Sequence, residues 1–291
     1  MRYRGTVIRP PSESDSYILQ VTYGCSHNRC GFCGTYLDKP FGVRPIQEIR
    51  QDIALAARAL PGTRRVFLAD GNALVLGMRA LTDILDSLGA AFPFLRRVGI
   101  YANARDILKK SDADLEVLKS KMLDIIYLGL ESGSDEVLRR IDKGATAAEM
   151  LEAVLKARRA GIRVSVIGLL GIGGPELSAR HAEETGRLVS AMDPEYLSLL
   201  TLMLVLGTEL HRQYTDGSFK LMGPEDLLAE MRAIITNTEN LSRCVFRTNH
   251  ASNYLPLSGT LSRDKTRLLS ALDDALQKGP AALRPEEWRA L

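Results

Sequence analysis

Residues 17–33, YILQVTYGCSHNRCGFC, run from a short apolar segment directly into three closely spaced cysteines. The apolar segment is typical of a buried strand, and the cysteines follow it in a loop that also contains three glycines within residues 24–34. Cys25, Cys30 and Cys33 have the spacing C-x4-C-x2-C, whereas the fourth cysteine, Cys244, lies far along the chain. The pattern predicts a strand that ends in a ligand-bearing loop.

The rest of the chain repeats the alternation of an apolar segment and an amphipathic one. Six apolar segments are expected to be strands: 17–22, 65–70, 97–102, 124–130, 163–170 and 195–204. A helical pattern follows each of the first five, with a start signal at Ser111 and a capping box of Thr146 and Glu149. Apolar strands that alternate with helices predict an α/β fold with a parallel sheet built from βαβ units.

The alternation ends near His211. We therefore expect residues 1–210 to form one domain and residues 211–291 to form an extension packed on it. The extension contains two helical patterns that flank a segment rich in Asn, Ser and Gly. Neither helix has enough apolar partners to form a core of its own.

Composition and charge indicate which partners and which cellular compartment to expect. The chain has 291 residues and a formal net charge of +3, so no nucleic-acid partner is expected. Residues 1–16 lack the apolar segment of a signal peptide, and no run is long enough to span a bilayer. These features predict a cytoplasmic protein with no membrane partner. In a reducing compartment, clustered cysteines are more often metal ligands than disulfides.

Two kinds of metal centre fit three thiolates in one loop. The thiolates could hold a four-iron cluster by three of its corners, or they could bind zinc with Cys244 or His27 as a fourth ligand. Zinc is less favoured because structural zinc modules usually supply two ligand pairs, and the chain has no second C-x2-C or H-x3-H pair. The spacing therefore favours a [4Fe-4S] cluster with one open iron.

The loop resembles that of the radical S-adenosylmethionine superfamily, whose commonest spacing is C-x3-C-x2-C. The stretch GCSHNRCGFCGTY is most similar to members related to the catalytic domain of Elongator-type and oxygen-independent coproporphyrinogen oxidase enzymes. The resemblance implies a partial (β/α)6 TIM-like barrel with a helical and loop C-terminal appendage. It also implies that Cys25, Cys30 and Cys33 hold a [4Fe-4S] cluster and that S-adenosylmethionine is the second cofactor.

The resemblance also assigns residues to the cofactor. Asp70, Gly71 and Asn72 occupy the place that holds the methionine amino group in the family. Glu131, in GLESGSDEVL, matches the residue expected to bond the ribose hydroxyls, with Ser132 beside it. A carboxylate at the end of an apolar strand needs a bonding partner, which is consistent with this role.

Six further residues are weaker candidates. Phe32 precedes the last cysteine, Gly168 lies in a glycine-bearing strand expected beside the adenine, and Asn103 and Arg105 follow the third strand. Each has an ordinary structural alternative, such as loop packing or a surface ion pair. Cys244 and His250 are candidate catalytic residues, Cys244 as a hydrogen-atom donor; the alternatives are a buried apolar cysteine and a polar turn.

The function that the resemblance implies is radical chemistry. The cluster reductively cleaves S-adenosylmethionine to a 5′-deoxyadenosyl radical, which abstracts hydrogen from an unidentified substrate. That substrate is expected to be a small molecule or a peptide, and an external flavodoxin- or ferredoxin-like protein is expected to supply the electron. The competing hypotheses are a zinc-stabilised binding module and a one-electron carrier.

Overall fold

The computed structural model describes residues 2–290, which group into two compact units. The first unit comprises the chain up to Asn28, Thr35–Leu128 and Glu152–Val164. The second comprises Arg29–Gly34, Gly129–Leu151 and the chain from Ser165 onward. The chain passes between the units inside the cysteine loop, so Cys25 belongs to the first unit and the other two loop cysteines to the second. Each unit is described by itself below.

Parallel strands form the centre of the first unit. In spatial order they are β1 (Tyr17–Gln20), β4 (Arg65–Ala69), β5 (Arg97–Ala102) and β6 (Leu123–Glu131). The last three residues of β6 belong to the second unit. A short antiparallel pair, β2 (Thr22–Tyr23) and β3 (Gly42–Val43), borders the start of the cysteine loop. Because the strands are parallel, the loops that follow β1, β4 and β5 lie at the same edge of the sheet.

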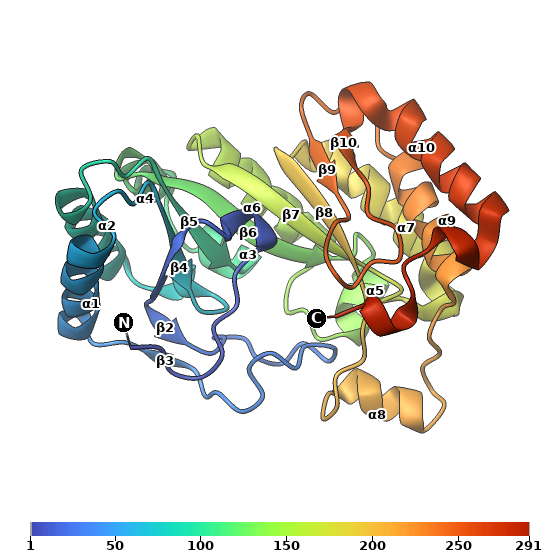
Figure 1. Cartoon of the computed structure of the whole chain (residues 1–291), viewed down its shortest axis with the longest axis horizontal. Coiled ribbons are helices and arrows are strands. Elements are labelled where there is room, and N and C mark those ends of the chain that lie inside the picture. The colour runs from blue at the N-terminus through green and yellow to red at the C-terminus, as the bar shows by residue number, and fades with distance from the viewer. Residues whose placement is uncertain (1, 291) are drawn as a thin grey trace. The chain divides into compact units, whose positions relative to one another are not determined.

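The first unit also contains helices, and the longer ones each bury an apolar stripe. The helices are α1 (Ile46–Ala59), α2 (Met78–Ala91), α3 (Ala104–Leu108), α4 (Asp112–Ser120), the short η1 (Pro11–Glu13) and η2 (Ala73–Val75), and most of α6 (Ala147–Arg159). On α1 the buried side chains include Ile49, Ile53 and Ala56, which follow helical spacing. Figure 1 shows α1 and α2 side by side. The predicted cap at Ser111 is confirmed as a capping box with Asp114.

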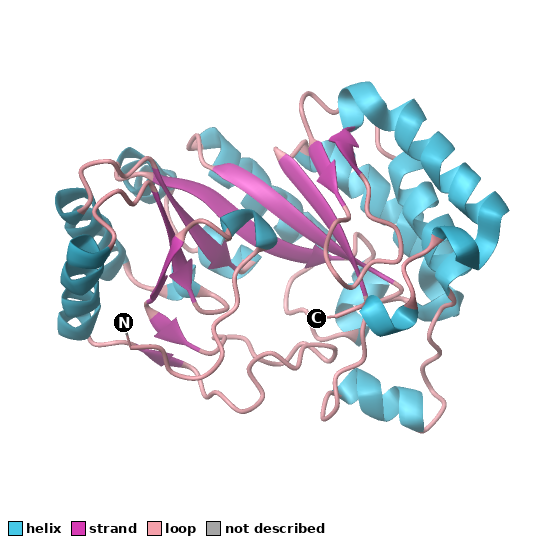
Figure 2. Cartoon of the chain, viewed as in Figure 1, coloured by secondary structure: helices cyan, strands magenta, loops and turns pink. Residues whose placement is uncertain are grey.

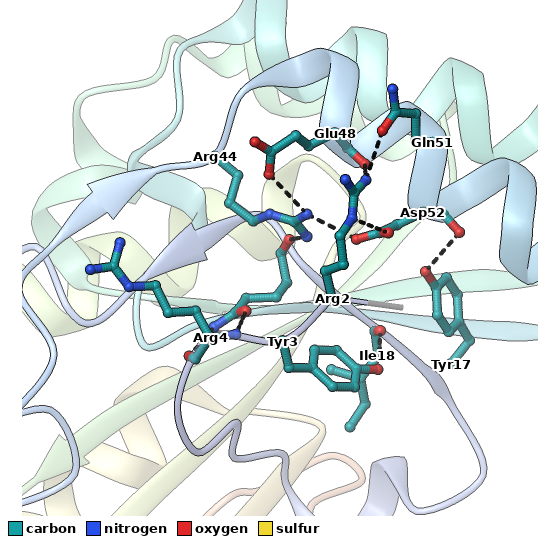
Figure 3. A network of polar contacts seen from close by, with 10 residues as sticks. Arg2, Tyr3, Arg4, Tyr17, Ile18, Arg44, Glu48, Gln51 and Asp52 are labelled. Carbon is teal, nitrogen blue, oxygen red and sulfur yellow. Dashed lines mark hydrogen bonds and ion pairs between the residues drawn. The ribbon is translucent and has the colours of Figure 1, made fainter.

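A network of polar contacts ties the N-terminal segment to β1 and α1 (Figure 3). Arg44 donates to Asp52 Oδ2 over 2.9 Å, and both side chains are buried. Arg2 reaches the same carboxylate through Oδ1 at 3.3 Å. Gln20, on β1, accepts from Arg4 N–H and donates back to the Arg4 carbonyl. The segment that precedes η1 is therefore fixed against the strand whose end carries the cysteine loop.

The second unit contains four strands and helices that pack on one another. The strands, in spatial order, are β7 (Arg163–Leu170), β8 (Tyr196–Thr201), β9 (Val245–Arg247) and β10 (Ser258–Thr260), of which β10 alone is antiparallel to its neighbour. The helices are α5 (Asp135–Arg140), α7 (Gly174–Met192), α8 (Glu209–Thr215), α9 (Pro224–Thr236), α10 (Leu261–Lys278), η3 (Gly279–Ala282) and η4 (Glu286–Trp288). Helix α9 packs against both α7 and α10, as Figure 2 shows.

The structure confirms the α/β class and all six predicted strands, with ends that differ by a few residues. The capping box of Thr146 and Glu149 is also confirmed, with hydrogen bonds of 2.7 and 3.2 Å. The extension differs from the prediction because it contributes two strands as well as helices. The boundary at residue 210 stays a prediction, and α9 and β9 pack on α7 and β8, which precede that residue. None of the helices described between residues 2 and 290 has the length and apolarity of a membrane span.

Candidate active site

Cys25 is held at the end of β4 by the residue before it. Gly24 donates its N–H to Asp70 Oδ2 over 3.2 Å, and its carbonyl accepts from Gly71 N–H over 3.2 Å. Asp70 and Gly71 directly follow β4, as the sequence predicts. The first unit therefore brings the first cysteine together with two of the residues that the resemblance assigns to S-adenosylmethionine.

Asp70 is completely buried, and its two carboxylate oxygens differ. Oδ2 accepts from Gln20 Nε2 at 2.8 Å and from Lys39 Nζ at 3.1 Å, and Lys39 is only 5% exposed. Oδ1 is buried without a hydrogen-bond partner among residues 2–290. Burying an acceptor with no partner costs free energy, so Oδ1 is a candidate acceptor for a ligand's donor group.

Asn72 joins the cysteine loop to the residues that follow β5. Its Nδ2 donates to Ser26 Oγ and to Asp106 Oδ2, each over 2.6 Å. Its Oδ1 accepts from the main-chain N–H of Asn103 over 3.0 Å. Asn72 is fully buried, so its amide serves to hold these loops together.

Asn103 and Arg105 lie on the same side of the first unit as the cysteine loop. The Arg105 guanidinium is 3.1 Å from His27 Nδ1, which places it beside the loop. The Nδ2 of Asn103 is a buried donor for which the described residues supply no acceptor. An amino acid offers an ammonium donor and a carboxylate acceptor, so Asp70 Oδ1 and Asn103 Nδ2 fit the methionine part of S-adenosylmethionine in chemistry.

In the second unit, main-chain hydrogen bonds hold the other half of the cysteine loop. Gly31 N–H donates to the Ile141 carbonyl and the Gly31 carbonyl accepts from Leu210 N–H, both over 2.8 Å. Cys33 N–H donates to the Cys30 carbonyl over 3.0 Å, which closes a turn around the two thiols. Both thiols are partly exposed and neither forms a disulfide. The loop thus presents two potential thiolate ligands on a fixed backbone.

Phe32, between these cysteines, packs on an apolar cluster. Its members are Val137, Ile141, Leu169, Ile172, Leu202 and Leu210. The ring therefore anchors the loop, which is the packing role named as the alternative above. Its role as a cofactor contact stays a prediction.

Glu131 and Lys143 form an ion pair of 2.8 Å in which each side chain is 10% exposed. Burial, the largest single effect, lowers the pKa of Lys143, but the charge and hydrogen bond of Glu131 together with the charges of Cys30 and Cys33 outweigh it and raise the pKa. The positive charge of Lys143 therefore lies near two predicted cluster ligands. The pair needs a glycine beneath it, because a Cβ at Gly129 would lie 2.3 Å from Glu131 Oε1.

Ser132 faces the interior of the second unit. It is fully buried, and its hydroxyl lies 2.8 Å from His181 Nδ1 on α7. The hydroxyl also accepts from Ser134 N–H over 3.0 Å. Its contacts therefore fix the turn after Glu131 to α7. Its role in binding the cofactor stays a prediction.

The structure gives each of the two catalytic candidates a structural environment, and their catalytic roles stay predictions. Cys244 is completely buried just before β9, beside Tyr196 at the amino end of β8, whereas Glu131 ends its strand at the carboxyl edge. A thiol enclosed at the opposite edge of the sheet is poorly placed to donate hydrogen to a substrate. His250 Nδ1 lies 2.9 Å from Ser252 Oγ, and Ser252 in turn accepts from Thr201 N–H.

The segment that contains His250 thus completes the hydrogen bonding at the carboxyl end of β8. Asn253 Nδ2 donates to the Leu199 carbonyl over 2.8 Å, in agreement with the alternative of a polar turn. Gly168 lies within β7, paired with Leu199 and packed beneath its side chain. Its predicted contact with adenine stays a prediction.

Within residues 2–290 no three His, Cys, Asp or Glu side chains are grouped as a metal site. The assignment of Cys25, Cys30 and Cys33 to one cluster therefore rests on their spacing and on the chemistry of three thiolates. Sequence reasoning missed four buried charged or titratable residues: Lys39, Lys143, His181 and Glu230. Each lies outside the motifs, so no local pattern indicates its partner.

Comparison with known proteins identifies the family. The profile of the Radical SAM superfamily matches residues 19–189, more than half of the chain. The uncharacterized protein MJ0486 of Methanocaldococcus jannaschii is 22% identical over 277 residues, which cover 89% of this chain and 83% of that protein. A tRNA-2-methylthio-N(6)-dimethylallyladenosine synthase of Geobacillus kaustophilus is 30% identical over 184 residues. The match spans 57% of this chain but only 32% of that synthase.

Solved structures agree with the predicted fold. Coproporphyrinogen III oxidase (HemN) from Escherichia coli has a TM-score of 0.58 at 15% identity, over 95% of this chain and 71% of that one. The Elp3 of Methanocaldococcus infernus has a TM-score of 0.55 at 14% identity, over 93% of this chain and 64% of that one. At such low identity the likeness shows the fold alone, and it confirms the expected fold class. The chain belongs to the radical SAM superfamily.

Proposed function

We propose that this chain is an enzyme in which Cys25, Cys30 and Cys33 hold a [4Fe-4S] cluster next to S-adenosylmethionine. When bound, these groups supply a reductive cleavage of a carbon–sulfur bond, and the resulting 5′-deoxyadenosyl radical removes a hydrogen atom from the substrate. The observation that carries the proposal is the C-x4-C-x2-C loop of thiols after the first strands, in a chain that belongs to this superfamily.

The residues of the first unit bind the methionine part of the cofactor. Asp70 Oδ1 accepts a hydrogen bond from the ammonium group, and Asn103 Nδ2 donates one to an oxygen of the ligand. Support comes from the lack of any other partner for these two buried atoms within the described chain. Arg105, beside His27, adds a positive charge that suits a carboxylate of cofactor or substrate.

In the second unit, Glu131 binds the ribose and Lys143 balances negative charge near the cluster. A carboxylate can accept up to four hydrogen bonds, so Glu131 retains acceptor capacity for ribose hydroxyls beside its contact with Lys143. The ammonium of Lys143 balances negative charge from Glu131 and the neighbouring thiolates.

The substrate is an organic molecule whose identity stays open. Two classes predicted from the sequence are small molecules and peptides, with a flavodoxin- or ferredoxin-like protein as electron donor. The prediction that no nucleic acid takes part is not supported, because several relatives are named as tRNA-modifying enzymes. An RNA substrate therefore joins the candidates, although this chain spans less than half of those relatives.

The test is anaerobic reconstitution followed by assay. We expect about four irons and four sulfides per chain and, after reduction with dithionite, release of 5′-deoxyadenosine from S-adenosylmethionine. The Cys33→Ala variant is the control and should release none. A protein that binds only zinc would contradict the proposal. So would a reducible cluster that never yields 5′-deoxyadenosine, which would indicate an electron carrier.

A further inference from the structure

The turn that follows Glu131 has a backbone that needs external support. Glu131 has φ of 63°, in the left-handed region that residues other than glycine rarely adopt. The turn closes with a hydrogen bond of 2.8 Å from Ser132 N–H to the Leu130 carbonyl. A conformation of this kind persists when neighbouring elements hold it, and here the neighbour is α7.

Helix α7 holds the turn at two points. Gly133 N–H donates to Thr185 Oγ1 over 2.8 Å, and the two backbones are so close that a Cβ at Gly133 would lie 2.4 Å from the Glu184 carbonyl oxygen. One turn earlier on α7, His181 Nδ1 lies 2.8 Å from Ser132 Oγ. The position of Glu131 thus depends on the position of the His181 ring.

Glu230, on helix α9 of the C-terminal extension, is the group that faces the other side of this ring. Its Oε1 lies 3.6 Å from His181 Nε2, and both side chains are completely enclosed. The same carboxyl group accepts from Gly171 N–H over 2.7 Å and from Ser178 Oγ over 2.5 Å. It therefore joins the start of α7, the ring on α7 and the turn that precedes that helix.

The protonation states of the two side chains are compatible with a link between them. Burial raises the pKa of Glu230 to about 7 and lowers the pKa of His181 to about 4. His181 Nε2 has no hydrogen-bond partner among the described residues, and Glu230 Oε1, at 3.6 Å, lies just beyond hydrogen-bond distance. Below neutral pH a small shift of either side chain lets a protonated Glu230 donate to the lone pair of Nε2. The imidazole then keeps its Nδ1 toward Ser132.

We propose that Glu230 is a positioning residue: through His181 and Ser132 it holds the Glu131 turn in the conformation that binds the ribose of S-adenosylmethionine. The inference rests on the proposed function and extends it, because it gives the C-terminal extension a part in cofactor binding. Glu230 itself touches neither cofactor nor substrate in this account.

Other charged groups near Glu230 are engaged elsewhere. On α7, Glu184 acts on His181 but bonds to Arg180 over 2.9 Å. On α10, Asp273 pairs with Arg232 over 2.5 Å, on a partly exposed face of α9. A pH dependence of cofactor affinity near neutrality is therefore expected to come from Glu230.

The experiment measures S-adenosylmethionine affinity by calorimetry on unreduced, anaerobically reconstituted protein between pH 6 and 8. Glu230→Met keeps the side-chain length but removes the polar contacts, and it should weaken binding about tenfold with unchanged iron content. Glu230→Gln can still donate to His181, so it should bind within about threefold of wild type. The control Glu225→Met changes an exposed residue of the same helix and should have no effect.

The pH profile separates positioning from general packing. Wild-type affinity should fall as pH rises above 7, because an ionised Glu230 can only accept from His181 and so favours the tautomer in which Nδ1 no longer donates to Ser132. Glu230→Gln should abolish this fall. The proposal is overturned if Glu230→Met binds as tightly as wild type. If that variant fails to fold, a wild-type pH profile in Glu230→Gln overturns it instead. A wild-type protein that binds no S-adenosylmethionine would reject the proposed function as well, so the two failures are distinguishable.

Discussion

The two groups of site residues solve the burial of polar atoms in different ways. Around Asp70 and Asn103, hydrogen bonds between loops leave one buried acceptor and one buried donor without partners in the described chain. Around Glu131, the buried charge is already compensated by Lys143 at 2.8 Å. The first group leaves two polar atoms available to a ligand, whereas in the second group a protein side chain already compensates the charge.

Because of this difference, substitutions in the two groups should affect ligand affinity and stability to different extents. A ligand can satisfy Asp70 Oδ1 and Asn103 Nδ2 without displacing a protein contact, so changes there should alter affinity more than stability. A ligand near Glu131 must share a carboxylate that already holds a cation, so changes there should alter both. Four predictions, in order of decreasing effect, test or refine this comparison.

The largest effect concerns the predicted cluster. We expect alanine at Cys25 or at Cys33 to reduce bound iron from about four atoms per chain to nearly none. Iron and sulfide analysis after anaerobic reconstitution measures this. Cys244→Ala is the matched control and should keep its iron, since Cys244 is buried at the other edge of the sheet. Retention of a full cluster without Cys25 would contradict the single-site hypothesis.

The next effect concerns the ion pair. Lys143→Met leaves Glu131 buried without its cation, and we expect it to lower the free energy of unfolding by about 3 kcal/mol in urea denaturation. Lys143→Arg keeps the positive charge, so its free energy of unfolding should fall by much less. The double variant Glu131→Gln with Lys143→Met should recover most of the loss, because neither charge then remains. An unchanged stability of Lys143→Met would show that the pair is solvated.

The third effect is the pH dependence of stability. The pKa of His181 is lowered to about 4, so its contribution to stability rises with pH between about 4 and 6.5. The pKa of Glu230 is raised to about 7, so its contribution falls as pH rises from about 4.5 to 7. In wild type these two pH dependences of the free energy of unfolding oppose each other. A variant that lacks one of the two groups keeps only the dependence of the other, which is at most about 1.4 kcal/mol per pH unit.

Denaturation from pH 5 to 6.5 therefore distinguishes two variants. Glu230→Gln should gain stability relative to wild type as pH rises, and His181→Asn should lose it. Parallel curves for both variants and wild type would mean that neither group titrates with a shifted pKa.

The smallest effect returns to the first group. Asn103→Ala removes a donor that has no partner in the described chain, so the free energy of unfolding should change by less than about 0.5 kcal/mol. Affinity for S-adenosylmethionine should fall about fivefold, the value of one hydrogen bond. Asn72→Ala is the matched comparison and should be destabilising, because its amide joins three loop positions. A stability loss in Asn103→Ala equal to that in Asn72→Ala would remove the distinction.

Local patterns predicted most of the fold. The six long apolar segments each form a strand because their own apolar composition favours burial. The caps at Ser111 and Thr146 are hydrogen bonds between residues close in sequence, so a local pattern predicts them as well. Strands β9 and β10 escaped prediction because each has three residues in a polar segment. Strand β9 forms because Val245 pairs with Tyr196, a residue far away in the sequence, and β10 forms because it pairs with β9.

For the candidate site, too, the sequence determines some features and the tertiary structure determines others. The chain's sequence alone determined which chemical groups are available: three thiols at cluster spacing, and Asp70, Asn72, Asn103 and Glu131 at the carboxyl ends of strands. Only the tertiary structure decided that Lys143 neutralises Glu131, that Lys39 holds one oxygen of Asp70, and that Cys244 lies at the opposite edge. The reason is physical: a residue type sets what a group can donate or accept, but burial and charge compensation depend on distances between segments that meet only after folding.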